Sequence, residues 1–286
     1  MQALIKQLHR SPMGQILDFK CRSACNARSS AEYNRRLSIS FTRQGSFRYH
    51  VGRRSYDIHS GVMLMERAGC EYTVSHRCAV KDECTIYEFE DEYVEELKES
   101  WVSSVGRSIL STVSPLAVLP TTPGLEFLHA AIRDTTQRPL WRAPLKTDAL
   151  VIALLQEIAQ AFGDHRKRQQ LSFRYEKLKD HQIEGLDRAK HFIVANFRQE
   201  LSLAEIARHS YVSVFHFSRL FKQFTALSPH RFLIDVRLKH AALLLRHTSL
   251  PITQICFDSG FNSFEHFILT FNKHYGRSPS KYRRQR

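Results

Sequence analysis

The last hundred residues contain one pattern of apolar and polar residues twice, at 201–222 and at 250–272. The copies align with an offset of 49 at Ala207 and Cys256, and with an offset of 50 at Phe217 and Phe267. We therefore expect the second turn to be one residue longer. Each copy is typical of a helix-turn-helix unit, and a repeat this detailed is not expected by chance. Two units at this spacing can enter successive major grooves of a duplex, which favours sequence-specific binding of double-stranded DNA.

The charge of the chain supports a polyanionic partner. The formal net charge is +14, and residues 181–286 contain 16 Lys and Arg against seven Asp and Glu. Nucleic acid is the first candidate for the partner and an anionic membrane surface the second. The alternative is an ordinary solvated basic surface, but the excess coincides with the repeats. A non-specific architectural protein that compacts DNA is a further alternative, although it does not need a large N-terminal region.

Short alternations of apolar and polar residues recur between about 35 and 90, separated by glycine turns. They predict an antiparallel sandwich or barrel, with strands at 37–41, 46–51, 62–65, 72–74 and 84–89. Amphipathic helices follow over about 91–162, and 145–162 is apolar enough to pack on the barrel or in a dimer. The charged stretch 163–180 breaks the periodicity at Gly163 and predicts a linker. The expected fold class is α+β, with domains at 1–162 and 181–286.

In the first copy, Ser202 and Glu205 have the spacing of a capping box. We expect Leu203, Ile206 and Ala207 to be buried in the first helix, and Ser213 to cap the second. In that second helix Phe217, Leu220 and Phe221 share an inward face. The outward residues are then candidates for DNA contact: Phe215, Ser218, Arg219 and Lys222.

These outward residues have distinct chemistry. Arg219 can donate two hydrogen bonds to a guanine, and Lys222 can neutralise a phosphate. Phe215 can touch a thymine methyl or a sugar, or else it is one more core residue. Between the copies, 229–246 reads as one helix of roughly 27 Å, against about 34 Å for a turn of B-DNA. We expect this helix to hold both recognition helices on one duplex, with DNA bending at a cost of a few kcal/mol.

Residues 183–286 resemble the DNA-binding domain of the AraC/XylS family of bacterial transcription regulators. The resemblance rests on these landmarks: 217–222, Ser228, Pro229, Arg237, Ala241, Leu244, Leu245, Ile252, Ile255, Gly260, Phe261, Phe267, Phe271, Gly276, Pro279, Tyr282 and Arg283. It implies an all-helical domain with two helix-turn-helix units. It further implies an N-terminal sensor and dimerisation domain, a cupin-like β-barrel with flanking helices, and an effector-responsive activator. Such a regulator acts as a homodimer, contacts RNA polymerase and responds to a small-molecule effector.

The second copy departs from the family pattern. Leu269 stands where the family usually has a basic residue, and Asn272 where it has Lys. The outward face becomes Phe264, Glu265, Ile268 and Leu269, of which only Glu265 can read a base directly, by accepting from cytosine. We therefore expect the first unit to supply most of the specific contact. The candidates in the second unit are Asn262, Ser263, Phe264, Glu265, Leu269 and Lys273.

The N-terminal region offers candidates for effector binding, chosen by residue type and strand parity: Tyr49, His50, Tyr56, His59, Tyr72 and His76. The alternatives are that they only pack, or that the domain only dimerises. A cupin-type metal enzyme would use His50, His59 and His76, but the closely spaced HxH pair is absent. The chain has no phosphate loop, GxSxG or HExxH motif, so we expect no catalytic residues, metal or cofactor.

The apolar segments indicate where the protein resides. The first ten residues contain no secretory apolar run, and the most apolar stretch, 149–155, is under half of a bilayer span. The six cysteines, at 21, 25, 70, 78, 84 and 256, are expected to be reduced thiols. Cys21 and Cys25 have a spacing that can serve a metal, but no second pair has the spacing of a structural zinc site. We expect a cytoplasmic, nucleoid-associated protein without a membrane anchor.

Overall fold

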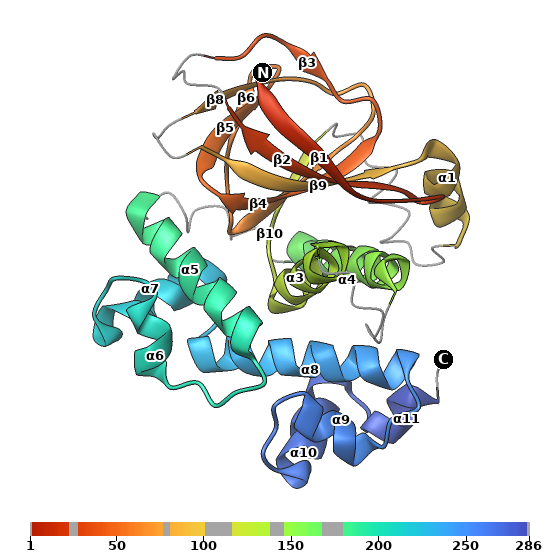
Figure 1. The fold of residues 1–286 in the computed structure, drawn as a ribbon, viewed down its shortest axis with the longest axis vertical. Coiled ribbons are helices and arrows are strands. Elements are labelled where there is room, and N and C mark those ends of the chain that lie inside the picture. Colours follow the sequence, from red (N-terminus) through yellow and green to blue (C-terminus); the bar gives the residue numbers. More distant parts are fainter. Residues whose placement is uncertain are drawn as a thin grey trace. The chain divides into compact units, whose positions relative to one another are not determined.

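The computed structural model describes residues 2–22, 28–76, 81–100, 116–137, 146–167 and 180–284. The chain forms two compact units (Figure 1). The first unit contains Met1–Thr121 and Ile152–Glu184, and the second contains Thr122–Val151 and Gly185–Arg286. Residues 122–151 thus group with the C-terminal unit, although they lie before the domain boundary predicted at 162. That boundary and the one at 180 stay predictions.

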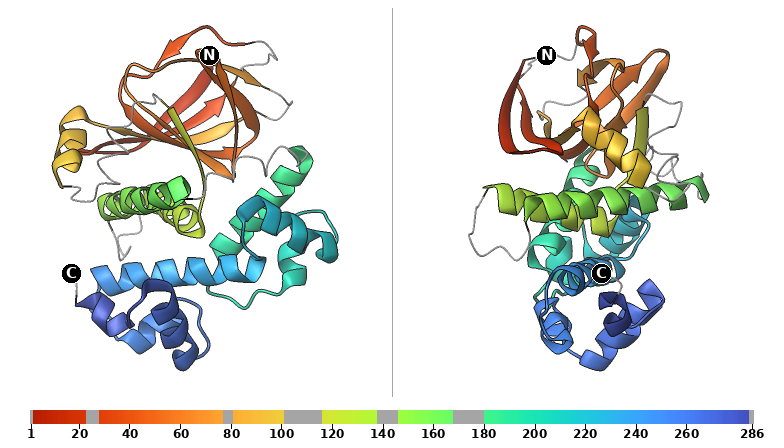
Figure 2. Two further views of the ribbon diagram at one scale, coloured as in Figure 1. Left: turned by 180° about the vertical axis from the view of Figure 1, so that it is seen from behind. Right: turned by 90° about the vertical axis from the view of Figure 1, so that its right-hand side faces the viewer.

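The first unit contains two antiparallel sheets, which face each other in Figure 2. The six-stranded sheet has the order β1 (Ala3–Ser11), β2 (Gly14–Cys21), β9 (Glu83–Phe89), β4 (Leu37–Gln44), β7 (Val62–Glu66) and β10 (Leu116–Pro120). The four-stranded sheet has the order β3 (Glu32–Tyr33), β8 (Glu71–His76), β5 (Ser46–Val51) and β6 (Arg54–His59). The antiparallel β-domain and the α+β class are confirmed.

Five strands lie at or near their predicted positions, but the sheets extend beyond residues 35–90. β1 and β2 precede that range, and β10 follows it. β1 was missed because it is a mostly exposed edge strand, with Leu4 and Ile5 about half exposed, so its polar and apolar residues do not alternate. β10 was missed because it ends in Pro120; an edge position tolerates a proline that a central strand would not.

The interior of the first unit is apolar where strands of the two sheets face each other. Phe47 and Tyr49 of β5 are buried, and their cross-strand partners Ile58 and Val74 share that face. Glu66 of β7 is a buried acid whose carboxylate accepts a hydrogen bond of 2.8 Å from the Ser38 hydroxyl. Burial raises the pKa of Glu66 to about 7.

The helical predictions before residue 180 are partly confirmed. Helix α1 (Asp91–Ser100) begins where expected, and its predicted continuation at Trp101 and Val105 lies outside the described residues. Helix α3 (Pro123–Gln137) begins at a proline that fits a first helical turn. Helix α4 (Thr147–Lys167) runs through Gly163, so the break predicted there is wrong. A single glycine costs a helix about 1 kcal/mol, too little to end this one.

The C-terminal unit is built around helix α8 (Pro229–His247), the expected helix between the repeats. Helices α5 (Asp180–Asn196), α6 (Leu203–Arg208) and α7 (Val214–Thr225) gather near its N-terminal end (Figure 1). Helices α9 (Ile252–Asp258), α10 (Phe264–Tyr275) and α11 (Pro279–Arg283) lie along its other half. Helix α3 also packs on α8. None of the helices in the described residues has the length and apolarity to cross a bilayer.

Candidate nucleic-acid interface

Helix α6 is the first helix of the first helix-turn-helix unit, and it begins with the predicted capping box. The Ser202 hydroxyl accepts from the Glu205 backbone N–H at 3.2 Å, and the Glu205 carboxylate accepts from the Ser202 N–H at 2.7 Å. The Ser202 hydroxyl also donates to this carboxylate at 2.6 Å, and the hydrogen bonds from the hydroxyl and from the backbone N–H lower the pKa of Glu205. Ile206 and Ala207 are buried as expected, whereas Leu203 is 41% exposed, so its predicted burial is wrong. It occupies the first turn, where the helix has not yet reached the core.

The second helix, α7, has a completely buried aromatic face. Phe217 and Phe221 are 0% exposed, and Phe221 packs edge-to-face on Phe232 of α8. Leu220 is only partly buried. Ser213 occupies the N-cap position, but its side chain makes no capping hydrogen bond, so the predicted cap is wrong in that respect. The hydroxyl of Ser213 is exposed instead.

The opposite face of α7 is open. Phe215 is 85% exposed, which excludes the alternative that it is a core residue. Arg219 and Lys222 are exposed and Ser218 is partly buried. Within the described residues, neither Arg219 nor Lys222 has an ion-pair partner. This face therefore presents two uncompensated cations and an aromatic ring.

The inner side of α7 packs near the buried ammonium group of a lysine. Lys190 of α5 is 1% exposed, and its ammonium lies 2.6 Å from the carboxylate of Glu126 in α3 and 3.4 Å from that of Asp187. The same ammonium lies 5.3 Å from the centre of the Phe224 ring at the end of α7. The ion pair thus ties α3 and α5 to the recognition helix. Gly185 of α5 permits close packing on the turn after α6, because a Cβ there would meet the Ser210 carbonyl oxygen at 2.4 Å.

The second helix-turn-helix unit repeats the first one with one difference in length. Helix α6 has six residues and α9 has seven, while the turns at 209–213 and 259–263 match. The prediction of a longer second turn is therefore wrong, because the additional residue continues the first helix. Phe267 and Phe271 are 0% exposed, like their counterparts in α7.

The exposed face of α10 is less charged. Glu265 is exposed, Leu269 is 70% exposed and Phe264 is 38% exposed. Ile268 was expected outside but packs partly against the core of this unit. Lys273 is exposed near the end of the helix. This face therefore presents one acid and two apolar side chains where α7 presents cations.

Two other candidates in the second unit have roles within the protein. Ser263 caps α10, its hydroxyl accepting from the His266 N–H at 3.2 Å. The Asn262 amide donates to the Glu200 carboxylate. Both side chains remain exposed. A DNA contact from Asn262 would compete with the hydrogen bond to Glu200.

Helix α8 joins the two helix-turn-helix units through a buried histidine. The Nδ1 atom of His240 lies 2.9 Å from the Ser259 hydroxyl in the turn of the second unit. Its Nε2 lies 3.3 Å from Arg198, which follows α5. Burial, with Arg198 as a second cause, lowers the pKa of His240 to about 3. Nearby, Gly260 has a φ of +83°, and a Cβ there would meet the Phe197 carbonyl oxygen at 2.7 Å.

Sequence reasoning missed three exposed residues at this surface. His216 and His266 occupy matching positions at the start of the two recognition helices, and both are exposed. The offset of 50 pairs them and was the signal available. Tyr211 is 83% exposed at a φ of +55°, with the Arg188 guanidinium 4.5 Å from its ring centre. A tyrosine at a positive φ gives no such signal, since glycine or asparagine is the usual occupant.

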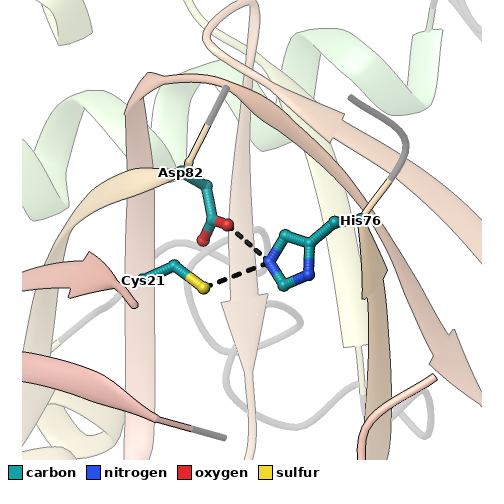
Figure 3. Close-up of side chains that lie close together, drawn as sticks. All are labelled: Cys21, His76 and Asp82. Carbon is teal, nitrogen blue, oxygen red and sulfur yellow. Dashed lines mark hydrogen bonds and ion pairs between the residues drawn. The ribbon is translucent and has the colours of Figure 1, made fainter. Parts of the chain in front are cut away.

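The six effector candidates of the N-terminal unit divide between two faces. By strand register, Tyr49, Tyr56, Tyr72 and His76 share the inner face of β5, β6 and β8. Tyr49 and Tyr72 stack with ring centres 4.6 Å apart. His50 and His59 point from the other face, and His50 lies 2.8 Å from the hydroxyls of Ser55 and Ser75. His76 lies beside Cys21 and Asp82 (Figure 3).

Comparison with known proteins agrees with this geometry. A family described as a helix-turn-helix domain matches residues 187–285. The HTH-type transcriptional regulator MtrA of Neisseria gonorrhoeae is 28% identical over 163 residues, which are 57% of this chain and 53% of MtrA. The HTH-type transcriptional activator RhaS of Klebsiella pneumoniae is 37% identical over 91 residues, which are 32% of this chain and 33% of RhaS. This chain therefore spans about half of the length of the first relative and a third of the second.

The solved structures include a transcriptional regulator with an AraC-type DNA-binding domain from Chromobacterium violaceum. It is 36% identical, with a TM-score of 0.34, and the match covers 35% of this chain and 90% of that one.

Proposed function

We propose that this chain, whose residues 187–285 form a helix-turn-helix domain of the AraC type, is a transcription regulator that binds double-stranded DNA at specific sequences. One observation carries the proposal. Helix α7 buries Phe217 and Phe221 completely while it exposes Phe215, Arg219 and Lys222 on its opposite face. A rigid helix with one sealed face and one polar, cationic face can enter a major groove and read base edges.

Each candidate residue at α7 has a defined role in this proposal. Arg219 donates to O6 and N7 of a guanine, and Lys222 neutralises a phosphate. Phe215 touches a thymine methyl or a sugar, and the Ser213 and Ser218 hydroxyls donate to nearby polar groups. The α10 residues Asn262, Ser263, Phe264, Glu265, Leu269 and Lys273 contribute apolar contact, shape and weaker polar contact.

Selection of bound fragments from a random duplex library, with the full-length protein, tests the proposal directly. We expect one sequence motif to be enriched, and binding to it to be at least 10³-fold tighter than to unrelated duplexes at physiological salt. A protein that compacts DNA without reading it would enrich no motif. It would still show a steep fall of affinity with salt, because counterion release does not depend on sequence.

A pair of charge-matched variants isolates the contribution of α7. Arg219→Ala should weaken binding to the selected site by about 1–3 kcal/mol and relax the preference at one base pair. Arg53→Ala removes the same charge from an exposed turn of the N-terminal unit and should leave the preference unchanged. Equal losses for both variants on specific and unrelated DNA would show that charge alone drives binding.

We further propose that the protein is an activator that binds two half-sites as a homodimer, contacts RNA polymerase and resides in the cytoplasm at the nucleoid. The name of the relative RhaS as an activator supports the sign of regulation. For the N-terminal unit we propose effector binding, supported by the inner-facing Tyr49, Tyr56 and Tyr72. A thermal-shift screen of metabolites tests it, because a ligand that prefers the folded state raises Tm.

A further inference from the structure

Three side chains of types that bind metal ions converge in the N-terminal unit. Cys21 is the last residue of β2, Asp82 directly precedes β9, and His76 is the last residue of β8 in the other sheet. Their ligand atoms all lie within 4.8 Å of one another. Figure 3 shows the Cys21 sulfur and the Asp82 carboxylate directed at one imidazole nitrogen. Residues distant in sequence thus meet at one point between two sheets.

The backbone holds two of the three residues in place. The Cys21 N–H donates to the Asp82 carbonyl oxygen at 2.9 Å, which continues the pairing of β2 with β9 beyond its last register pair. Gly45 lies against Asp82 at a φ of +77°, and a Cβ there would sit 3.0 Å from the Asp82 Cα. The main chain therefore positions both residues independently of their side chains.

The side chains are also well buried. Cys21 is 3% exposed and Asp82 is 2% exposed, and the His76 side chain is 10% exposed. The Oδ1 atom of Asp82 is fully buried. It lies 2.6 Å from the imidazole Nε2 of His76, which is an ion-pair distance. A buried carboxylate needs a compensating charge, and a cation supplies it.

The geometry argues for a metal ion rather than a cysteine-histidine-aspartate relay. In such a relay the acid and the thiol contact different nitrogens of the imidazole, so that one nitrogen donates while the other accepts. Here the Cys21 Sγ lies 3.4 Å from Nε2, the same atom that Asp82 contacts. Because both groups contact the same nitrogen, the relay, which needs one donating and one accepting nitrogen, is not formed. Three ligand atoms within 4.8 Å of one another suit a single cation.

We propose that Cys21, His76 and Asp82 bind a divalent transition-metal ion of the zinc type, which fastens the ends of the two sheets together. A thiolate, an imidazole and a carboxylate are all zinc ligands, whereas a thiolate disfavours calcium and magnesium. Bonds of about 2.3 Å to sulfur and 2.0 Å to nitrogen at a tetrahedral angle separate these atoms by about 3.5 Å. The observed 3.4 Å between the Cys21 Sγ and the His76 Nε2 matches this separation, and the Asp82 carboxylate shifts on binding to reach its own ligand distance.

Three protein ligands leave one position of a tetrahedral ion for water or another donor. Cys25 and Cys78 lie outside the described residues and are not part of the proposed site. The site differs from the cupin-type arrangement considered from the sequence, because neither His50 nor His59 contributes to it. The site is independent of the proposed DNA contacts, which lie in the other unit.

Zinc titration of the chelator-treated full-length protein tests the site. We expect one equivalent of zinc per chain by elemental analysis after gel filtration, and a rise in Tm on zinc addition. Cobalt in place of zinc should give thiolate-to-cobalt charge-transfer absorption, which reports a metal–sulfur bond. None of these experiments measures DNA binding, so failure of the regulator proposal would leave their result unaffected.

Variants locate the ion. Cys21→Ser should abolish the charge-transfer band, and Asp82→Asn, which keeps the shape of the side chain, should weaken zinc binding by at least tenfold. Cys70→Ser changes another buried cysteine and should leave both readings unchanged. Circular dichroism of each metal-free variant establishes that it folds. Substoichiometric binding to the wild-type chain, or stoichiometric binding unchanged in Cys21→Ser and Asp82→Asn, would overturn the proposal.

Discussion

The two helix-turn-helix units bury matching residues in their cores and differ in the residues that they expose. Phe217 and Phe221 in α7 and Phe267 and Phe271 in α10 are all completely buried. At the outward positions, the offset of 50 aligns Leu269 with Arg219 and Asn272 with Lys222. The core positions are restricted because they fill the same space in both units. The exposed positions are not restricted by packing, so the two helices can acquire different chemistry on the same scaffold.

The units also differ in how they are anchored. Near α7, the buried Lys190 ion pair joins α3 and α5, and it lies against Phe224. In the second helix-turn-helix unit, α8 holds the turn between α9 and α10 through the hydrogen bond between His240 and Ser259. One anchor depends on paired charges and the other on an uncharged imidazole. Four predictions follow from these contrasts, in order of decreasing effect.

The largest effect is expected at the charged anchor. Lys190→Met removes the ammonium and leaves the buried carboxylates of Glu126 and Asp187 uncompensated, which should destabilise the C-terminal unit by about 3–5 kcal/mol. Denaturant unfolding of the full chain measures the loss. Adding Glu126→Gln should recover part of the stability, since one buried charge is then removed. A loss below 1 kcal/mol in the single variant would contradict a buried role for the ion pair.

The neutral anchor should make stability depend on pH. The pKa of His240 is lowered to about 3 in the folded protein, so the unfolded chain binds the extra proton between about pH 3 and 6.5. Stability from this group is complete above pH 6.5 and falls toward pH 3, by about 1.4 kcal/mol per pH unit within that window. His240→Gln retains hydrogen-bonding capacity without titrating in this range.

The comparison of Tm between wild type and His240→Gln at pH 4, 5, 6 and 7 measures this contribution. The difference is needed because Glu66 acts in the opposite direction. Its raised pKa of about 7 makes stability fall as pH rises from about 4.5 to 7. That effect is present in both proteins and cancels. Parallel Tm profiles would show that His240 does not carry the pH dependence.

Exchange of outward residues should exchange the roles of the recognition helices. Leu269→Ala should weaken specific binding by less than about 1 kcal/mol, against about 1–3 kcal/mol for Arg219→Ala. Leu269→Arg adds a cation at the position matching Arg219, and the salt dependence of log K should steepen by about 0.9 if it meets a phosphate. Footprinting and salt titration measure both. Greater sensitivity to Leu269→Ala than to Arg219→Ala would reverse the ranking of the units.

The smallest effect is expected at the ends of the recognition helices. Ala226 ends α7 at a φ of +62°, and Gly276 ends α10 at +69°. An alanine at positive φ is strained by about 1 kcal/mol relative to glycine. Ala226→Gly should therefore stabilise by up to about 1 kcal/mol and Gly276→Ala should destabilise by a similar amount, as read from thermal unfolding. The same sign for both variants would contradict this explanation.

Local patterns predicted the C-terminal unit better than the N-terminal one. The spacing of Phe217 and Phe221 placed one face of α7 inside, and the Ser202 and Glu205 spacing located the start of α6. These signals work because a helix has one period and its neighbours are close in sequence. The prediction failed at Leu203 and Ile268, which lie at the edge of a buried face, where small differences in packing decide exposure.

The N-terminal unit was predicted less completely because its contacts join distant residues. Edge strands such as β1 lack alternation, and parity puts the adjacent Tyr49 and His50 on opposite faces without saying which of them faces inward. The register with β6 and β8 decides which of them faces inward, and that register depends on how strands pair.

By itself, the amino-acid sequence determined the duplicated helix-turn-helix pattern, the antiparallel β region and the outward chemistry of α7, because each is encoded in residues close along the chain. The tertiary structure decided that Lys190 meets Glu126 and that His76 meets Cys21 and Asp82. The members of each set come from separate elements. Their meeting depends on helix packing and strand registry, which no single stretch of sequence encodes.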